Sequence, residues 1–444
     1  MNAMTDTGPL GLNAQIAAGT RYESYWTATA PRYRAAVAAP LGDRVDVAVI
    51  GGGFTGLSAA LALARSGANV VVLEAGMIGG GASGRNGGQC NNGTATDFAS
   101  LVAGIGMERA SAYYRAFDSA VDTVERIVSE EAIACDFHRT GKIKLAAKPE
   151  HYEKLMRSHD ALQLGTDTDI RLVPRADLAA EVGTAGYYGG LVFARSAGMH
   201  MGKFLMGLAE AATRHGASIH QDTSVTAIKR LSGARHRITT SRGSLTADAV
   251  LVATGASMTG PFGRFRRRIV PVGSFIVVTR ALPRATLDTI MPTRRMVTDS
   301  RNIGSYFRVT PDDRLLFGGR ARFAMSNPLS DAKSGRILRR RMAEVFPQLA
   351  GTEIDYCWGG IVDMTADRLP RAGEHAGLFY SMGYSGHGTQ MATHMGQVMA
   401  GVISGTGKTS IWCDMDWPAI PGHFGPPWFL PVVGAYFRLQ DILH

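Results

Sequence analysis

The stretch from Val45 to Glu74 constrains the fold most, because an apolar run, a glycine loop and an acidic residue follow in a fixed order. It reads VDVAVIGGGFTGLSAALALARSGANVVVLE. Residues 45–50 fit a buried parallel strand, residues 57–66 fit an Ala- and Leu-rich helix that stops at Gly67, and residues 69–73 fit a second strand. A strand, GxGxxG loop, helix, strand and acid in this order indicate a dinucleotide site in a doubly wound α/β fold.

The glycines of this unit each permit a close approach. Gly51 allows the tight turn, Gly53 lets the backbone reach a pyrophosphate, and Gly56 lets the helix pack on the strand. The free N–H groups at the helix start, with the helix dipole, then face the phosphates. Glu74 follows at the spacing expected for a group that binds ribose hydroxyls. At this point NAD and FAD fit equally well.

Composition limits the class of protein. The chain has 444 residues, enough for two or three domains, and a net charge of +10. A basic chain can bind nucleic acid, but the basic residues are scattered and the one dense run, 264–268, is short, so we expect no nucleic-acid partner. The start resembles no signal peptide, and no apolar run reaches the roughly 20 residues of a membrane span. Four cysteines without a CxxC motif indicate reduced thiols. We therefore expect a cytoplasmic enzyme with no integral membrane segment.

Nucleotide-type segments recur along the chain and are interrupted twice. We predict a discontinuous Rossmann-like domain of residues 44–95, 196–262 and 355–413, interleaved with an α+β substrate domain of residues 96–195 and 263–354 built on an antiparallel sheet. Residues 1–43 are expected to be an extension whose aromatic patch packs on the surface rather than in the active site. Residues 414–444 are expected to be a tail with an amphipathic helix packed on the outside, and membrane contact there is the less favoured alternative.

Four stretches resemble the D-amino acid oxidase superfamily of FAD-dependent oxidoreductases. They are the GxGxxG unit with Glu74, the loop Gly81–Gln89 (GASGRNGGQ), Ala253–Ala256 (ATGA), and Trp358–Gly373 (WGGIVDMTADRLPRAG) with Gly383–Gln390 (GYSGHGTQ). Within it, the RNGGQ, DMTADRLPRAG and IPGHFGPPWFLPVVGAYFRL strings are similar to those of γ-glutamylputrescine oxidoreductases. The resemblance implies an FAD domain of the glutathione-reductase type. It also implies oxidation of an amine C–N bond to an imine, which water opens to an aldehyde, in putrescine and polyamine catabolism.

The resemblance also carries a set of FAD contacts onto this sequence. They are Gly51, Gly53, Phe54, Thr55, Gly56, Glu74, Ala75, Ser83, Arg85, Asn86, Gly87, Gly88, Gln89, Val225, Thr254, Gly255, Gly360, Gly386, His387, Gly388 and Thr389. We expect non-covalent FAD and no metal site. Relatives that bind flavin covalently have a cysteine where this chain has Gly360, and Cys357 lies too early in the strand.

Three residues are candidates for catalysis: His387, Tyr306 and Asp363. His387 either lies at the flavin edge or bonds to the backbone at a helix start. Asp363 either meets a distal charge of the substrate amine or pairs with Arg368. Val362 stands where glycine-oxidase-type enzymes have a carboxylate-binding arginine, which argues against an α-amino acid substrate.

Three further residues are candidates for substrate binding: Arg308, Arg320 and Tyr384. Tyr306 and Arg308 alternate along one strand and should face one side. Arg308 and Arg320 either bind a substrate carboxylate, such as a glutamyl group, or lie on the surface. No lysine stands near them in sequence, so O₂ and another electron acceptor both remain open. The alternative function is an oxidase or dehydrogenase of glycine, proline, sarcosine or a D-amino acid.

Overall fold

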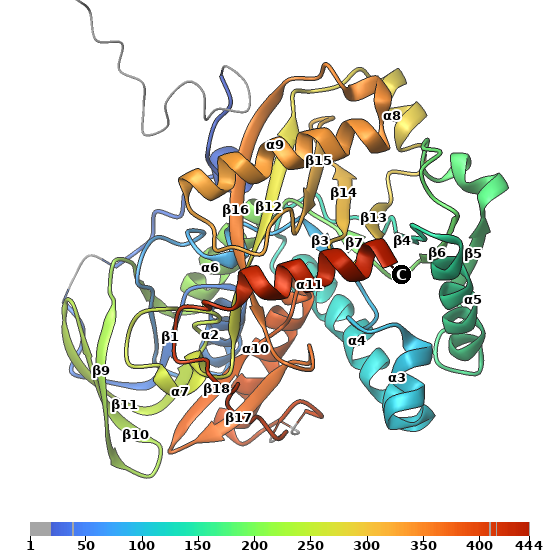
Figure 1. Cartoon of the computed structure of the whole chain (residues 1–444). Coiled ribbons are helices and arrows are strands. Elements are labelled where there is room, and N and C mark those ends of the chain that lie inside the picture. Colours follow the sequence, from blue (N-terminus) through green and yellow to red (C-terminus); the bar gives the residue numbers. More distant parts are fainter. Residues whose placement is uncertain (1–18, 38–39, 408–409, 414, 444) are drawn as a thin grey trace, which may run out of the picture.

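The computed structural model describes residues 19–37, 40–407, 410–413 and 415–443. Figure 1 shows two sheets side by side, with helices packed around both. Residues 1–18, which hold the chain start that we judged unlike a signal peptide and much of the predicted N-terminal extension, lie outside the described residues.

The first sheet is the nucleotide-type sheet that the glycine motif predicts. Its order is β17-β18-β11-β1-β2-β8, with the β9–β10 hairpin paired to β11. The pairs β18–β11, β11–β1, β1–β2 and β2–β8 are parallel. The strands are β1 (Arg44–Ile50), β2 (Val70–Leu73), β8 (Ser218–His220), β9 (Val225–Ser232), β10 (Arg235–Thr240), β11 (Gly243–Val252), β17 (Arg371–His375) and β18 (Leu378–Met382).

The second sheet collects strands from two distant parts of the chain. Its order is β16-β12-β15-β14-β13-β4-β6-β5, and neighbouring strands are antiparallel except for β13 and β4. The strands are β4 (Lys142–Leu145), β5 (Ile170–Pro174), β6 (Gly189–Phe193), β12 (Val270–Thr279), β13 (Met296–Asp299), β14 (Ser305–Val309), β15 (Leu315–Gly319) and β16 (Ile354–Met364). A third, two-stranded sheet pairs β3 (Gln89–Cys90) with β7 (Ala197–Gly198). In the sequence, each of these strands stands between a strand of the first sheet and a strand of the second.

One predicted domain boundary needs a correction. We assigned residues from 355 onward to the nucleotide-binding domain, yet β16 hydrogen-bonds along nearly the whole of β12. Residues 354–364 therefore belong to the second sheet, and the chain returns to the first sheet only at β17. The error arose because a buried apolar strand looks the same in either sheet. The rest of the predicted division of the chain into domains stays a prediction.

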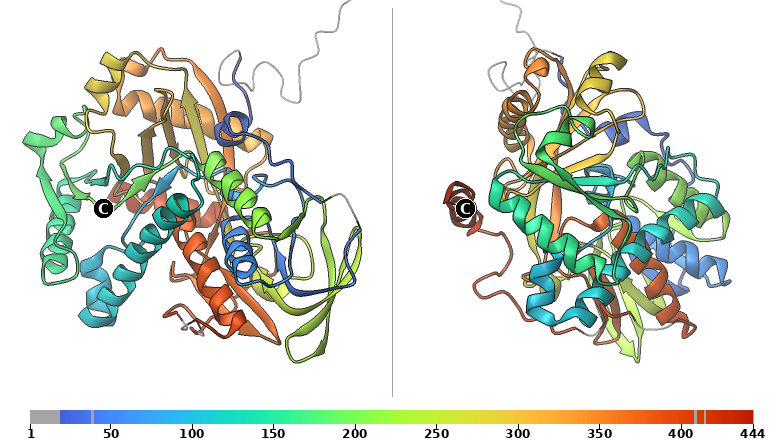
Figure 2. Two further views of the ribbon diagram at one scale, coloured as in Figure 1. Left: turned by 180° about the vertical axis from the view of Figure 1, so that it is seen from behind. Right: turned by 90° about the vertical axis from the view of Figure 1, so that its right-hand side faces the viewer.

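Helices cover both sheets. They are α1 (Tyr25–Thr29), α2 (Phe54–Arg65), α3 (Phe98–Ile105), α4 (Met107–Glu130), α5 (Pro149–Gln163), α6 (Met201–Arg214), α7 (Gly263–Arg266), α8 (Arg284–Ile290), α9 (Pro328–Val345), α10 (Gly388–Ser404) and α11 (Leu430–Leu443), with 3₁₀ turns at Ala82–Gly84, Arg175–Ala180 and Pro347–Leu349. Figure 2 shows them from behind and from the side.

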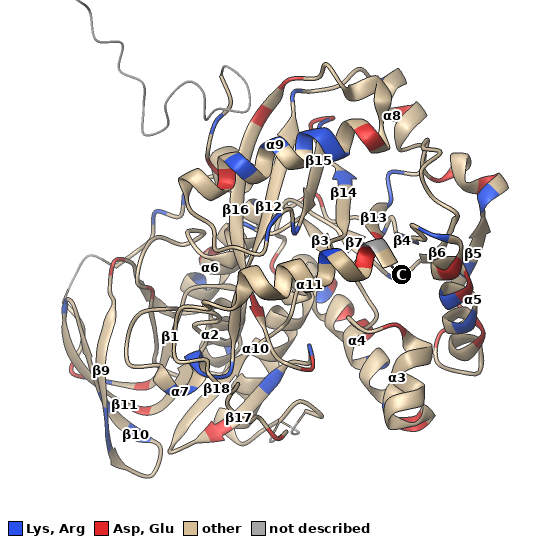
Figure 3. Cartoon of the chain, viewed as in Figure 1, with Lys and Arg blue, Asp and Glu red and all other residues tan. Residues whose placement is uncertain are grey.

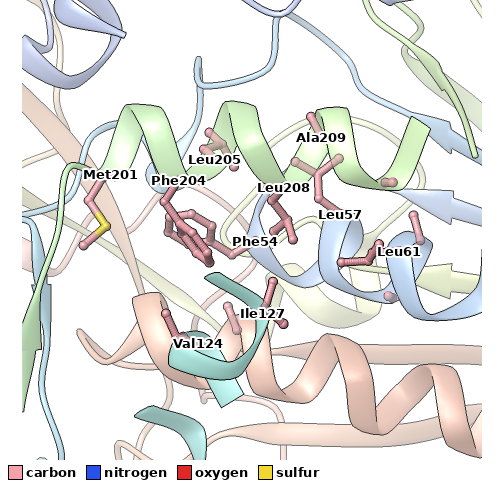
Figure 4. Close-up of a cluster of buried hydrophobic side chains, with 14 of the residues drawn as sticks. Phe54, Leu57, Leu61, Val124, Ile127, Met201, Phe204, Leu205, Leu208 and Ala209 are labelled. Atoms are coloured by element: carbon pink, nitrogen blue, oxygen red, sulfur yellow. The ribbon is translucent and has the colours of Figure 1, made fainter. Parts of the chain in front are cut away.

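The main core lies where α2, α4, α6 and α10 meet. Figure 4 shows apolar side chains of α2, α4 and α6 interleaved there, among them Phe54, Phe204 and Leu208, all nearly or fully buried. Helix α2 is buried on almost all sides, which its Ala- and Leu-rich sequence allows. A Cβ on Gly396 of α10 would lie 2.5 Å from the Thr55 carbonyl oxygen, so α10 crosses α2 in close backbone contact. These contacts hold the starts of α2 and α10 at the same side of the fold.

The N-terminal aromatic residues do not pack on the surface as we expected. Tyr25 is 2% exposed and Trp26 is fully buried within the main core. Trp26 Nε1 donates a hydrogen bond of 2.6 Å to the carbonyl oxygen of Asn86, in the glycine-rich loop that the resemblance places beneath the flavin. The segment is therefore part of the support for the site.

The C-terminal tail forms a helix, as predicted. Helix α11 packs Leu430, Val433 and Phe437 against Phe323 and its neighbours. None of the helices in the described part of the chain is long and apolar enough to span a bilayer.

Candidate active site

A large cavity of about 1580 Å³ runs between the two sheets. It exceeds the roughly 300–1,000 Å³ of common ligand pockets, so it has room for a long cofactor and a substrate. Its wall includes the carboxyl ends of β1, β2 and β11, the loop 79–91, and residues of β4, β12, β13, β14 and β16. Ligands of open α/β sheets bind at such carboxyl ends.

One end of the cavity is built by the glycine loop. The helix α2 starts at Gly53, which provides no side-chain cap, and the Ser83 hydroxyl accepts the N–H of Phe54 at 3.0 Å. The Glu74 carboxylate accepts the N–H groups of Gly52 at 2.7 Å and Gly76 at 3.0 Å, which fixes it at the cavity wall. A Cβ on Gly53 would lie 2.9 Å from Ser83 Oγ, so the loop leaves space only for backbone. These features fit an adenosine and pyrophosphate end of a dinucleotide.

The loop Gly81–Gln89 is held in place by hydrogen bonds to distant parts of the chain. Besides the bond from Trp26, Arg85 Nε donates to the Gly359 carbonyl at 2.6 Å and Trp358 Nε1 donates to the Arg85 carbonyl at 3.1 Å. The guanidinium of Arg308 donates to the Gly88 carbonyl. A rigid loop of small residues suits a flat ring lying against it.

The other end of the cavity is formed by the start of α10. His387 is the residue before the helix, and its side chain does not cap it. Its backbone N–H donates to the Tyr384 carbonyl at 2.9 Å. The imidazole stands at 79° to the ring of Phe117, and its buried Nδ1 has no partner among the described residues. Burial, with the charges of Lys142, Lys144 and Arg320, lowers the pKa of His387 to about 3, so the ring is neutral. The imidazole of His387 lines the cavity, and its place at a flavin edge stays a prediction.

Two lysines that were not predicted as site residues line the cavity. Lys142 and Lys144 lie on one face of β4 and both reach the cavity wall. Lys142 Nζ donates to the Asn92 carbonyl at 2.5 Å and lies 4.6 Å from the centre of the Phe193 ring. Burial lowers the pKa of Lys142 to about 7 and also lowers that of Lys144. The alternation in GKIKLA was visible, but its lysine face fits a solvent-exposed strand equally well.

Arg320 and Tyr306 also line the cavity. Arg320 follows β15 and donates one long bond, 3.5 Å, to the Asn302 carbonyl; no carboxylate among the described residues pairs with it. Burial, chiefly, lowers its pKa to about 10. The Tyr306 ring lies between Gly87 and Gly318, where a Cβ on either would come within 2.5 Å of it, and its hydroxyl is 3.0 Å from Ser274 Oγ. Burial raises the Tyr306 pKa to about 12, so the phenol is protonated.

The cavity brings together most of the predicted residues. Those that line it are Gly51, Gly53, Phe54, Thr55, Glu74, Ala75, Ser83, Arg85, Asn86, Gly87, Gln89, Val225, Thr254, Gly255, Tyr306, Arg320, Gly360, Asp363, Tyr384, Gly386, His387, Gly388 and Thr389. Gly56 and Gly88 do not line it and instead allow close packing, since a Cβ would lie 1.9 Å from the Gly51 carbonyl and 2.5 Å from the Trp26 ring respectively.

Two predicted substrate contacts need correction. The buried Arg308 does not line the cavity, because its guanidinium is bonded to the carbonyl groups of Gly88 and Met199 behind the loop. Tyr384 does line it, but its hydroxyl points into the fold, 2.8 Å from Thr55 Oγ1 and 2.9 Å from Ser381 Oγ. Both residues support the site instead of presenting a polar group to it.

Asp363 lines the cavity but forms no ion pair with Arg368 in the described structure. Its carboxylate accepts the N–H of Gly383 at 2.7 Å, which positions the loop before α10. Burial, opposed by bonds from Gly383 and Tyr384, raises the Asp363 pKa to about 6.

The cysteines stay away from the cavity. All four are among the described residues, none forms a disulfide bond, and none lines the wall. Cys357 points the other way, with Sγ 3.4 Å from the Asp331 carbonyl. At Gly360, a Cβ would lie 2.9 Å from the Arg85 carbonyl, so the wall there has no space for a larger side chain.

Known proteins are similar to this chain in sequence. The sequence model of the DAO family, FAD dependent oxidoreductases, matches residues 46–402. The chain is 30% identical to the gamma-glutamylputrescine oxidoreductase of Escherichia coli (strain K12), over 95% of this chain and 98% of that protein. It is 32% identical to the probable oxidoreductase OrdL of Rhizobium meliloti (strain 1021), over 90% and 92% of the two chains.

A solved structure agrees on the fold. The glycine oxidase of Geobacillus kaustophilus superposes with a TM-score of 0.68 at 22% identity, covering 83% of this chain and 96% of that one. The predicted superfamily, fold class and FAD dependence are confirmed by these matches. This chain belongs to the DAO family and is an FAD-dependent oxidoreductase.

Proposed function

We propose that the enzyme oxidises an amine C–N bond to an imine, with γ-glutamylputrescine or a similar amine bearing a distant carboxylate as substrate. The observation that carries the proposal is Arg320, a cavity-lining cation without a carboxylate partner in the described structure. Support comes from the similarity to the gamma-glutamylputrescine oxidoreductase of E. coli.

Arg320 is suited to hold the carboxylate end of the substrate. A guanidinium offers paired N–H donors that match a carboxylate, and in a cavity shielded from water such a pair is worth more than on the surface. Arg320 makes one long bond to a carbonyl, so most of its donors are available. Tyr306, beside it, adds a protonated hydroxyl at the same end of the cavity.

The charges of the cavity favour a neutral substrate amine. Loss of hydride from the carbon next to nitrogen needs the nitrogen lone pair, so the amine must bind without its proton. Lys142, Lys144 and Arg320 all act on the imidazole of His387, and an ammonium beside that ring would feel the same repulsion. The bound flavin would accept the hydride. Neutral His387, with Nδ1 unpartnered, is placed to make one hydrogen bond to the amine. With γ-glutamylputrescine the oxidised nitrogen is a primary amine, so water opens the released imine to an aldehyde and ammonia.

We also propose that the FAD is held without a covalent bond, as the position of Gly360 and the four cysteines supports. Acid precipitation should then release yellow flavin into the supernatant. Flavin that stays on the pellet would contradict the proposal.

A second candidate is an amino-acid oxidase or dehydrogenase. It is favoured by the 26% identity to the glycine oxidase of Geobacillus kaustophilus, over 81% of this chain and 93% of that one. It is opposed by Val362 at the position where we expected such enzymes to have a carboxylate-binding arginine.

An anaerobic flavin-reduction screen separates the two candidates. Purified enzyme is mixed without oxygen with γ-glutamylputrescine, putrescine, glycine, proline, sarcosine and D-amino acids, and the visible band of oxidised flavin is followed. We expect γ-glutamylputrescine to bleach it at the lowest concentration. Bleaching by an amino acid alone would establish the second candidate instead.

A further inference from the structure

The C-terminal tail carries a row of large apolar side chains that nothing in the described chain covers. On α11, Val432, Tyr436, Leu439 and Leu443 recur at helical spacing, so they share one face. Two further exposed aromatic side chains, Trp428 and Phe424, stand in the non-helical segment before this helix. The exposed fractions of these six side chains run from 54% for Leu439 to 77% for Phe424. We call this row the apolar stripe.

The opposite side of α11 is fixed to the body of the protein. The Phe437 ring stacks on Phe323 at 5.6 Å, and Leu430 is 3% exposed. The Asp441 carboxylate accepts the N–H groups of Asn302 and Ile303, both at 2.8 Å. Figure 2, right, shows α11 standing out at the edge of the molecule. The helix therefore presents the stripe outward on a fixed support.

A groove of unpaired arginines adjoins the stripe. It is lined by Gly263, Arg264, Arg266, Arg267, Arg268, His375 and Phe424. Among the described residues no carboxylate forms an ion pair with these arginines; Arg266 and Arg268 bond only to backbone carbonyl groups. The guanidinium of Arg267 lies 5.4 Å from the centre of the Phe424 ring, so the groove and the stripe meet at this residue.

The backbone joins the two features into one surface. Ile420 N–H donates to the Arg267 carbonyl at 2.9 Å, and Arg268 Nε donates to the Trp417 carbonyl at 2.6 Å. The segment 417–424 therefore runs along the arginine groove and leads directly into α11. In Figure 3 basic ribbon marks α7 and the turn after it, while α11 is mostly uncharged.

We propose that this surface docks the enzyme on an anionic lipid bilayer, with the apolar stripe in the headgroup boundary and the arginine groove against lipid phosphates. An amphipathic helix and a basic patch together supply the two signals that stable association with a membrane surface requires. A second copy of this chain is a poorer occupant, because each copy carries a net charge of +10 and would bring a second arginine groove. The docking does not depend on the identity of the substrate.

Vesicle co-sedimentation of the holoenzyme tests the proposal. Vesicles of phosphatidylglycerol and phosphatidylcholine are compared with vesicles of phosphatidylcholine alone, and with the first kind in high salt. We expect binding to the anionic vesicles, weakened by salt, with a blue shift of tryptophan emission as Trp428 leaves water. No binding to anionic vesicles, or equal binding to both kinds, would overturn the proposal.

Variants separate the surface from bulk charge. Each arginine near an anionic membrane contributes roughly fivefold to binding, so Arg264→Glu with Arg267→Glu should weaken it by at least about twentyfold. The matched control, Arg284→Glu with Arg340→Glu, removes the same charge from exposed positions on α8 and α9 and should leave binding near wild type. Trp428→Ser with Tyr436→Ser should also release the enzyme from vesicles. If the stripe variant instead splits a dimer, measured by light scattering, and keeps vesicle binding, the occupant is a second copy and the proposal is wrong.

Discussion

Gly56 lies where helix α2 packs against the glycine loop. A Cβ there would lie 1.9 Å from the Gly51 carbonyl, and strand and helix both hold that backbone in place. We predict that Gly56→Ala displaces α2 from the glycine loop and weakens FAD binding by about tenfold or more, as overpacking costs about 1–3 kcal/mol. Equilibrium dialysis of flavin measures this. Gly104→Ala on α3, where a Cβ meets nothing within 4 Å, is the control and should bind FAD as wild type does. Equal affinity of the two variants would contradict the packing role.

The burial of Lys142 predicts how the free energy of unfolding changes with pH. Its folded pKa is about 7, against 10.5 in the unfolded chain, so between these values the unfolded chain binds the extra proton. The free energy of unfolding should rise with pH across this window by at most about 1.4 kcal/mol per pH unit, and Lys142→Met should lack that rise. Urea unfolding of both proteins at pH about 7.5 and about 9.5 measures it. The exposed Lys154→Met on α5 is the control. A gap between wild type and Lys142→Met that is the same at both pH values would disprove the burial of the ammonium.

At the scale of elements, α1 supports the loop Gly81–Gln89 through the hydrogen bond from Trp26. Trp26→Phe keeps an aromatic ring but removes the 2.6 Å bond to the Asn86 carbonyl, leaving that carbonyl unsatisfied. A loss of about 1–3 kcal/mol should appear as faster flavin release. Trp412→Phe is the matched control, because this tryptophan is also buried but its Nε1 has no hydrogen-bond partner among the described residues. Flavin dissociation followed by fluorescence should change in the first variant alone, and an equal change in both would refute the assignment.

Local sequence patterns predicted most helices and strands, but they did not predict which side chains each strand places in the cavity. The glycine unit, the strand ending in ATGA and the helix at Gly388 were predicted because each has a strong local signal, and the structure contains all three. The strand β4 was also predicted, yet its lysines were not recognised as cavity residues, because alternation alone does not say which face is covered. The prediction for Arg308 was wrong for a related reason. We expected it in the site because it shares a strand with Tyr306, but its guanidinium is bonded to the Gly88 carbonyl behind the loop.

At the scale of the whole molecule, contacts between segments far apart in the chain could not be predicted from the sequence. β4 pairs with β13, more than a hundred residues later in the chain, and Trp26 reaches the loop Gly81–Gln89 from the N-terminal side of the chain. Such contacts leave no periodic signal in a single sequence. The predicted cytoplasmic location and the electron acceptor stay untested, and the proposed docking surface would bear on both.

The central claim is that Arg320 selects an amine with a distant carboxylate, and comparing γ-glutamylputrescine with putrescine tests it most directly. These amines differ only in the glutamyl group, and the rate of anaerobic flavin reduction is measured with wild type, Arg320→Met and Arg320→Lys. A buried charge pair lost is worth about 2–5 kcal/mol, so wild type should prefer the glutamylated amine by at least about thirtyfold. Arg320→Met should lose most of this preference and Arg320→Lys should keep part of it. Equal rates with both amines in wild type, or a full preference in Arg320→Met, would contradict the account.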